Sequence, residues 1–102
     1  MPTLVWKAPM QYFSQRDEAA FFGWLQSIPG VTSVRGQGLE LHIQLHSKRL
    51  SRESLLELIS LYTRYNGNLH ELSEFESDSN RGWFKDKDSY WFAGVFGEAG
   101  AV

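Results

Sequence analysis

The chain has 102 residues, 42% of them hydrophobic and 15% aromatic, which allows one domain with a single modest core. Its formal net charge is -2. Proteins that hold nucleic acid usually carry an excess of positive charge, so the composition argues against a nucleic-acid partner. The absence of cysteine excludes disulfides, thiolate metal sites and cysteine nucleophiles, and it suits a reducing cytoplasm.

No stretch approaches the roughly 20 consecutive apolar residues that a membrane span needs, and the first residues do not resemble a secretion leader. We therefore expect a soluble, cytoplasmic protein that makes no membrane contact. Residues 1–97 are expected to form a single α+β domain, and residues 98–102 a flexible tail.

The first predicted elements are a strand and a helix. Leu4–Lys7 is a short β-branched and aromatic run, which is typical of a strand. Ser14 precedes Asp17 by three residues, the spacing of a helix N-cap box. Apolar residues then recur at helical spacing until Pro29 and Gly30, so a helix is expected between these signals.

A hairpin is predicted next, with arms at Val31–Arg35 and Leu39–His46 joined by the glycine-bearing residues 36–38. The second arm alternates strictly between apolar and polar side chains, which indicates one buried and one wet face. The apolar side chains expected on the buried face are Leu39, Leu41, Ile43 and Leu45.

A second long helix is predicted to begin after the N-cap residue Ser51 and to end at Asn66 and Gly67. Its expected inward stripe is Leu55, Leu58, Ile59, Tyr62 and Tyr65. Asn68 and Glu71 have a second capping-box spacing, which predicts a short third helix.

The last third of the chain combines a polar loop with closely spaced aromatic residues. Residues 77–82 are expected to be the loop. Asp88 can cap a last helical segment over residues 88–96, although a strand remains a competing interpretation and Gly94 costs a helix about 1 kcal/mol. The aromatic side chains in this region are expected to complete the core.

The element order β-α-β-β-α predicts a three-stranded antiparallel sheet in which the first strand lies beside the third. We expect both long helices on one face and short helical additions at the C-terminal end. This arrangement is similar to a ferredoxin-like unit that lacks its last strand.

An acidic segment is the clearest electrostatic feature of the sequence. Glu71, Glu74, Glu76 and Asp78 follow one another without an intervening lysine or arginine. Such a surface attracts a basic partner, and tryptophans such as Trp83 and Trp91 are common anchors in protein interfaces. The competing interpretation is a solvated helix face beside aromatic residues that only fill the core.

A smaller cluster of cations, Lys48, Arg49 and Arg52, surrounds the predicted start of the second long helix. Helix N-termini hold phosphate groups through free N–H groups, so the cluster is a weak candidate for phosphate or nucleic-acid binding. The chain has no phosphate-loop glycine pattern, and cations that pair with neighbouring acids are the simpler interpretation.

The histidines are weak candidates for a metal site or a general base. His42 and His46 face the same side of a strand, but four residues separate them by about 13 Å, too far for one metal ion. His42 with a ligand from a neighbouring strand, and His70 beside Glu71 or Glu74, are the remaining candidates for a base or a metal site. Because no catalytic motif is present, we expect no metal, no cofactor and no catalytic residue.

In three groups of residues the chain resembles small bacterial proteins of about this length whose function is uncharacterised. The groups are Trp83-Phe84, Tyr90-Trp91 and Val95-Phe96-Gly97 near the end, with Phe21-Phe22-x-Trp24-Leu25 and Leu58-Ile59-x-Leu61-Tyr62-x-Arg64-Tyr65 in the helices. This resemblance implies a stand-alone bacterial domain and carries no activity. In size and acidity the chain is also similar to immunity proteins that neutralise bacterial toxins.

The leading hypothesis from the sequence is a non-enzymatic protein-binding domain, of immunity or adaptor type, whose acidic and aromatic surface meets a basic partner. The alternatives are a small metal- or histidine-dependent enzyme and a weak phosphate or nucleic-acid binder. A homodimer that pairs edge strands Leu4–Lys7 or Val31–Arg35 also remains open.

Overall fold

An antiparallel sheet of three strands organises the computed structural model, which describes residues 2–7 and 11–97. The predicted tail, residues 98–102, lies outside the described residues. The elements in chain order are β1 (Thr3–Trp6), α1 (Gln15–Ser27), β2 (Val31–Gln37), β3 (Glu40–Leu45), α2 (Arg52–Arg64), the 3-10 helix η1 (Leu69–Phe75), α3 (Arg81–Phe84) and α4 (Phe92–Phe96).

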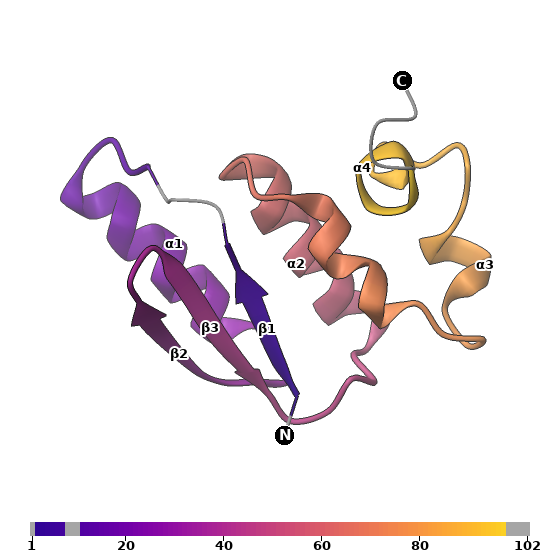
Figure 1. Cartoon of the computed structure of the whole chain (residues 1–102), viewed down its shortest axis with the longest axis horizontal. Helices are drawn as coiled ribbons and strands as arrows, with labels where there is room; N and C mark the ends of the chain where they lie inside the picture. The colour runs from indigo at the N-terminus through magenta and orange to yellow at the C-terminus, as the bar shows by residue number, and fades with distance from the viewer. Residues whose placement is uncertain (1, 8–10, 98–102) are drawn as a thin grey trace.

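The strand order is β1-β3-β2, so the predicted pairing of the first strand with the third is confirmed (Figure 1). Leu4 of β1 and Val34 of β2 lie on either side of Ile43 in the central strand. Both β1 and β2 are therefore edge strands.

The hairpin between β2 and β3 is tighter than predicted. β2 continues through Gly36 and Gln37, and the turn consists of Gly38 and Leu39. Gly38 has a φ of +61°, the left-handed conformation that the first central residue of a type II′ turn requires. Leu39, expected on the buried face, is 75% exposed because it lies at the turn, beyond the end of the core.

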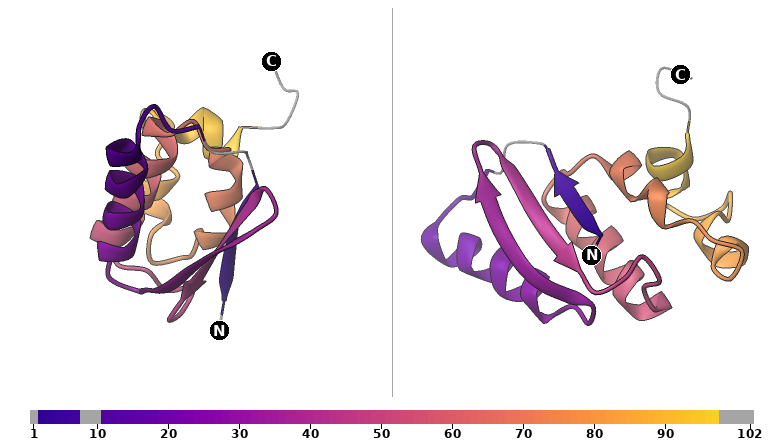
Figure 2. Two further views of the ribbon diagram at one scale, coloured as in Figure 1. Left: turned by 90° about the vertical axis from the view of Figure 1, so that its left-hand side faces the viewer. Right: turned by 60° about the horizontal axis from the view of Figure 1, so that its bottom comes forward.

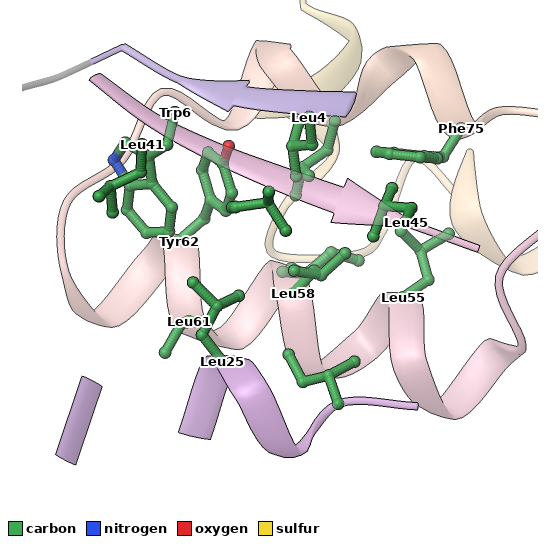
Figure 3. Packing of buried hydrophobic residues seen from close by; sticks show 14 of the residues in the cluster. Leu4, Trp6, Leu25, Leu41, Leu45, Leu55, Leu58, Leu61, Tyr62 and Phe75 are labelled. Carbon is green, nitrogen blue, oxygen red and sulfur yellow. The ribbon is translucent and has the colours of Figure 1, made fainter. Parts of the chain in front are cut away.

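One face of the sheet is covered by α1 and α2, which lie side by side across it (Figure 2). The predicted alternation in β3 is confirmed, since Leu41, Ile43 and Leu45 are buried. Leucines of α1 and α2 meet them from the helix side, as Figure 3 shows. Trp24 of α1 also donates a 2.7 Å hydrogen bond to Glu57 of α2, which joins the two helices near the surface.

Serine residues begin both long helices, as predicted. The Ser14 hydroxyl accepts a hydrogen bond from the N–H of Asp17, and the Ser51 hydroxyl accepts one from the N–H of Ser54. Each bond satisfies one of the N–H groups that a helix leaves without a partner in its first turn.

After α2 the chain reverses through Asn66, whose φ is +59°. Asn68 caps η1 as expected, but its side chain accepts from the N–H of His70 rather than of Glu71. Leu72 and Phe75 of η1 are buried, so one edge of this segment packs against the core.

The C-terminal region is helical, and the predicted cap and loop there are partly wrong. α4 begins at Phe92 without a side-chain cap, because Asp88 lies in the turn that precedes it. The predicted loop 77–82 ends early, since α3 begins at Arg81. Phe84 and Val95 enter the core, whereas Trp83 and Trp91 are only partly buried.

None of the helices in the described ranges is long and apolar enough to cross a membrane.

Two glycine-to-alanine variants should change stability in opposite directions. A Cβ atom at Gly67 would lie 2.6 Å from ring carbons of both Trp6 and Tyr62, so Gly67→Ala should lower the free energy of unfolding by about 1–3 kcal/mol. At Gly23, in α1, no neighbouring atom lies within 4 Å of such a Cβ, so Gly23→Ala should raise it by about 0.5–1 kcal/mol. Urea denaturation measures both, and a stable Gly67→Ala protein would contradict this account of the packing.

Candidate functional site

A groove of about 410 Å³ runs along β1, on the side away from β3. The 3-10 helix η1 forms its other wall (Figure 1). The lining residues are Thr3 and Val5 from β1, Lys7 directly after it, and Asn68, His70, Glu71, Ser73 and Glu74 from η1 and its cap. Its volume lies within the roughly 300–1,000 Å³ that is usual for small-ligand sites.

Glu71 holds the two walls of the groove together. Its Oε1 accepts a 2.9 Å hydrogen bond from the hydroxyl of Tyr62, and its Oε2 accepts a 3.3 Å bond from the N–H of Lys7. Tyr62 is fully buried and stacks on Trp6, with ring centroids 3.9 Å apart. Glu71 is therefore a structural carboxylate, with both oxygens occupied.

Burial, together with the nearby Glu71 carboxylate, raises the pKa of Tyr62 well above its ordinary value of 10.0. Both effects favour the neutral phenol, which can donate its hydrogen bond to Glu71.

Glu74 is the carboxylate of the groove that remains open to a ligand. Its nearest cation is Lys48, at 4.0 Å, and both side chains are substantially exposed, at 41% and 63%. An exposed pair at this distance is worth about 0–1 kcal/mol, so a bound cation can displace Lys48 at little cost.

His70 presents one ring nitrogen to a carbonyl and leaves the other available. Its Nδ1 lies 3.1 Å from the main-chain oxygen of Val95. Because a carbonyl oxygen only accepts, Nδ1 is the donor in this contact, and Nε2 is left for another partner.

The rest of the acidic segment is occupied by cations of its own chain. Arg81 donates to Glu76 at 2.6 Å and to Asp78 at 2.8 Å, and Lys85 lies 3.7 Å from Glu76. The hydrogen bond from Arg81 lowers the pKa of Glu76 below its ordinary value. The four predicted acidic residues therefore divide into a groove pair, Glu71 and Glu74, and a neutralised pair, Glu76 and Asp78.

Trp83 and Trp91 belong to a small aromatic cluster at the C-terminal end, and neither lines the groove. Their rings meet edge to face with centroids 6.3 Å apart. Trp91 donates a 2.7 Å hydrogen bond to the carbonyl of Phe84, and Arg52 lies 5.2 Å from the centre of the Trp83 ring. These contacts favour packing, with Tyr90 left 63% exposed at the margin.

The three cations predicted as a phosphate site do not converge. Lys48 faces Glu74 and Arg52 lies over Trp83, so Arg49 alone lines the second cavity, of about 260 Å³, before α2. The other polar lining residues there are His46, Ser47, Ser51 and Ser54.

The remaining histidines give no metal set. His42 lies 3.2 Å from Glu40 on its own strand, and His46 follows the end of β3. Across residues 2–7 and 11–97, no three histidine or carboxylate side chains are grouped closely enough to hold a metal ion.

Sequence reasoning missed the groove because its walls are far apart in the chain. Lys7 and Glu71, which join them, are separated by 64 positions. The prediction that Leu4–Lys7 is an edge strand indicated an open side of the sheet, but nothing in the sequence showed which element would lie beside it.

Comparisons of the chain with family models, with curated proteins and with solved structures return no match.

The stability of the protein should fall steeply at high pH because of Tyr62. The folded protein keeps the Tyr62 proton above pH 10, whereas the unfolded chain releases it, so the unfolded state binds fewer protons. The free energy of unfolding should therefore be unaffected by this group below about pH 9 and lose about 1.4 kcal/mol per pH unit above pH 10.

Tyr62→Phe isolates this effect. The variant should lose about 1 kcal/mol at neutral pH with the hydrogen bond to Glu71, and decline less steeply above pH 10. Tyr12, whose pKa burial raises to about 12, contributes equally to both proteins and serves as an internal reference. Parallel urea-denaturation curves for the two proteins between pH 9 and pH 11 would contradict the assignment.

Proposed function

We propose that the chain is a non-enzymatic protein-binding domain, of immunity or adaptor type, that holds a basic segment of another protein in the groove between β1 and η1. The observation that carries this proposal is Glu74. Its carboxylate lines a groove of about 410 Å³, and within residues 2–7 and 11–97 its one ion pair is the long, exposed contact with Lys48. A lysine or arginine of a partner would find there a carboxylate that is available for binding.

The groove is a better candidate than the acidic segment as a whole. Glu76 and Asp78 already bind Arg81, so a basic partner would have to displace a cation held by close hydrogen bonds. Trp83 and Trp91 remain candidates for a secondary contact, through the edges that are not buried.

We also propose that the fold is a ferredoxin-like unit without its last strand. The order β1-β3-β2 supports this because the missing strand of such a unit would lie beside β1, where the groove is. The lack of cysteine supports a cytoplasmic location, where thiols stay reduced and disulfides are rare.

The test is a nuclear magnetic resonance titration with a capped peptide of alternating lysine and valine. We expect shifts of groove amides with the wild-type protein and roughly tenfold weaker binding to Glu74→Lys, because reversal replaces an attraction with a repulsion. A peptide of alternating glutamate and valine should bind weakly or not at all.

Asp78→Lys is the matched control, since it changes the net charge by the same amount outside the groove. Its affinity for the lysine peptide should stay within about twofold of the wild type, because Asp78 does not line the groove and its exposed carboxylate already binds Arg81. Equal losses in the two variants would show that only net charge matters and would contradict a site at Glu74.

A further inference from the structure

The hydrogen-bonding pattern of β1 determines which main-chain groups face the groove. Leu45 donates its N–H to the carbonyl of Pro2. Bonded and non-bonded pairs alternate in an antiparallel ladder, so Leu4 and Trp6 also bond to β3, whereas Thr3, Val5 and Lys7 direct their N–H and C=O groups to the opposite side. Thr3 and Val5 of β1, with Lys7 directly after the strand, are also the residues on this side that line the groove.

Most of these outward groups have no partner in the structure. Glu71 accepts from the N–H of Lys7, but no described residue forms a hydrogen bond with the outward N–H or C=O groups of Thr3 and Val5. A row of open main-chain donors and acceptors is the template on which a further strand forms.

We propose that the partner binds by strand addition: an extended segment of another protein pairs with Thr3 and Val5 and supplies a fourth strand to the sheet. This inference rests on the proposed function, and it specifies the form of the ligand. Main-chain bonds supply affinity in this mode, and alternate side chains supply specificity. Because side chains alternate along a strand, every second one can reach the η1 wall, where Glu74 selects lysine or arginine.

A second copy of this chain does not fit the groove as well as a single extended segment. In each copy η1 lies against β1, so two paired β1 strands would bring two η1 helices to the same edge. An extended peptide carries no such neighbour.

The first experiment uses the same lysine and valine peptide and measures amide hydrogen exchange. Exchange at Thr3 and Val5 should slow on binding, because their N–H groups become bonded, while exchange at Leu4 should change little. Methylation of alternate peptide nitrogens in the bonded register should weaken binding roughly tenfold, and methylation shifted by one residue should have little effect.

A variant of β1 provides an independent test. Val5→Pro removes the outward N–H without removing a bond to β3, and proline is tolerated at such edge positions. Its affinity for the peptide should fall roughly tenfold, whereas Val5→Thr, which keeps the N–H, should bind like the wild type. If Val5→Pro fails to fold, the exchange and methylation measurements still decide the question.

The outcomes separate the two proposals. Binding that depends on Glu74 but neither slows exchange at Thr3 and Val5 nor responds to peptide methylation would overturn strand addition and leave the protein-binding function standing. No shift with the peptide at about 5 mM would overturn both, since even weak sites bind at millimolar concentration. A wild-type dimer that Val5→Pro converts to a monomer would also overturn the proposal, by showing that a second copy occupies the edge.

Discussion

The stacking of Trp6 on Tyr62 is the contact on which the position of everything after α2 depends. It joins the first strand to the second long helix, with ring centroids 3.9 Å apart and both side chains fully buried (Figure 3). Gly67 then passes so close to both rings that a Cβ atom there would require the rings to shift. The Tyr62 hydroxyl donates a hydrogen bond to Glu71 of η1, which places η1 beside β1. One aromatic pair therefore determines where the groove forms.

The C-terminal helices extend this arrangement and do not compete with it. η1 contributes Leu72 and Phe75 to the main core and supports α4, where a side chain at Gly94 would collide with Leu69. The glycine that weakens α4 as a helix is thus the residue that lets it approach η1. Aromatic residues from α3 and α4 then extend the core, in which Phe84 is fully buried.

Patterns within one element were readable from the sequence, and relations between distant elements were not. Alternation predicted the buried face of β3, and serine spacing predicted the caps of both long helices, because each depends on residues a few positions apart. The turn at Gly38 was misplaced and α3, which begins at Arg81, was not predicted, since neighbouring glycines and polar residues allow several local conformations. For the candidate site the acidic residues were found, but their roles were not: Glu71 acts as a buried-side hydrogen-bond acceptor and Glu76 as a partner of Arg81, and both depend on contacts that a charge count cannot see.

The edge of β1 is partly open and partly covered, which fits the single extended ligand that we propose. An unprotected edge would invite pairing with any exposed strand, as in aggregation. Here Glu71 accepts a hydrogen bond from the N–H of Lys7 at one end of the edge. η1 lies beside β1, in the way of a second sheet. The main-chain groups of Thr3 and Val5 face a groove of about 410 Å³ that also carries the carboxylate of Glu74. Such an edge fits the ligand that we propose, one extended strand with a positive charge.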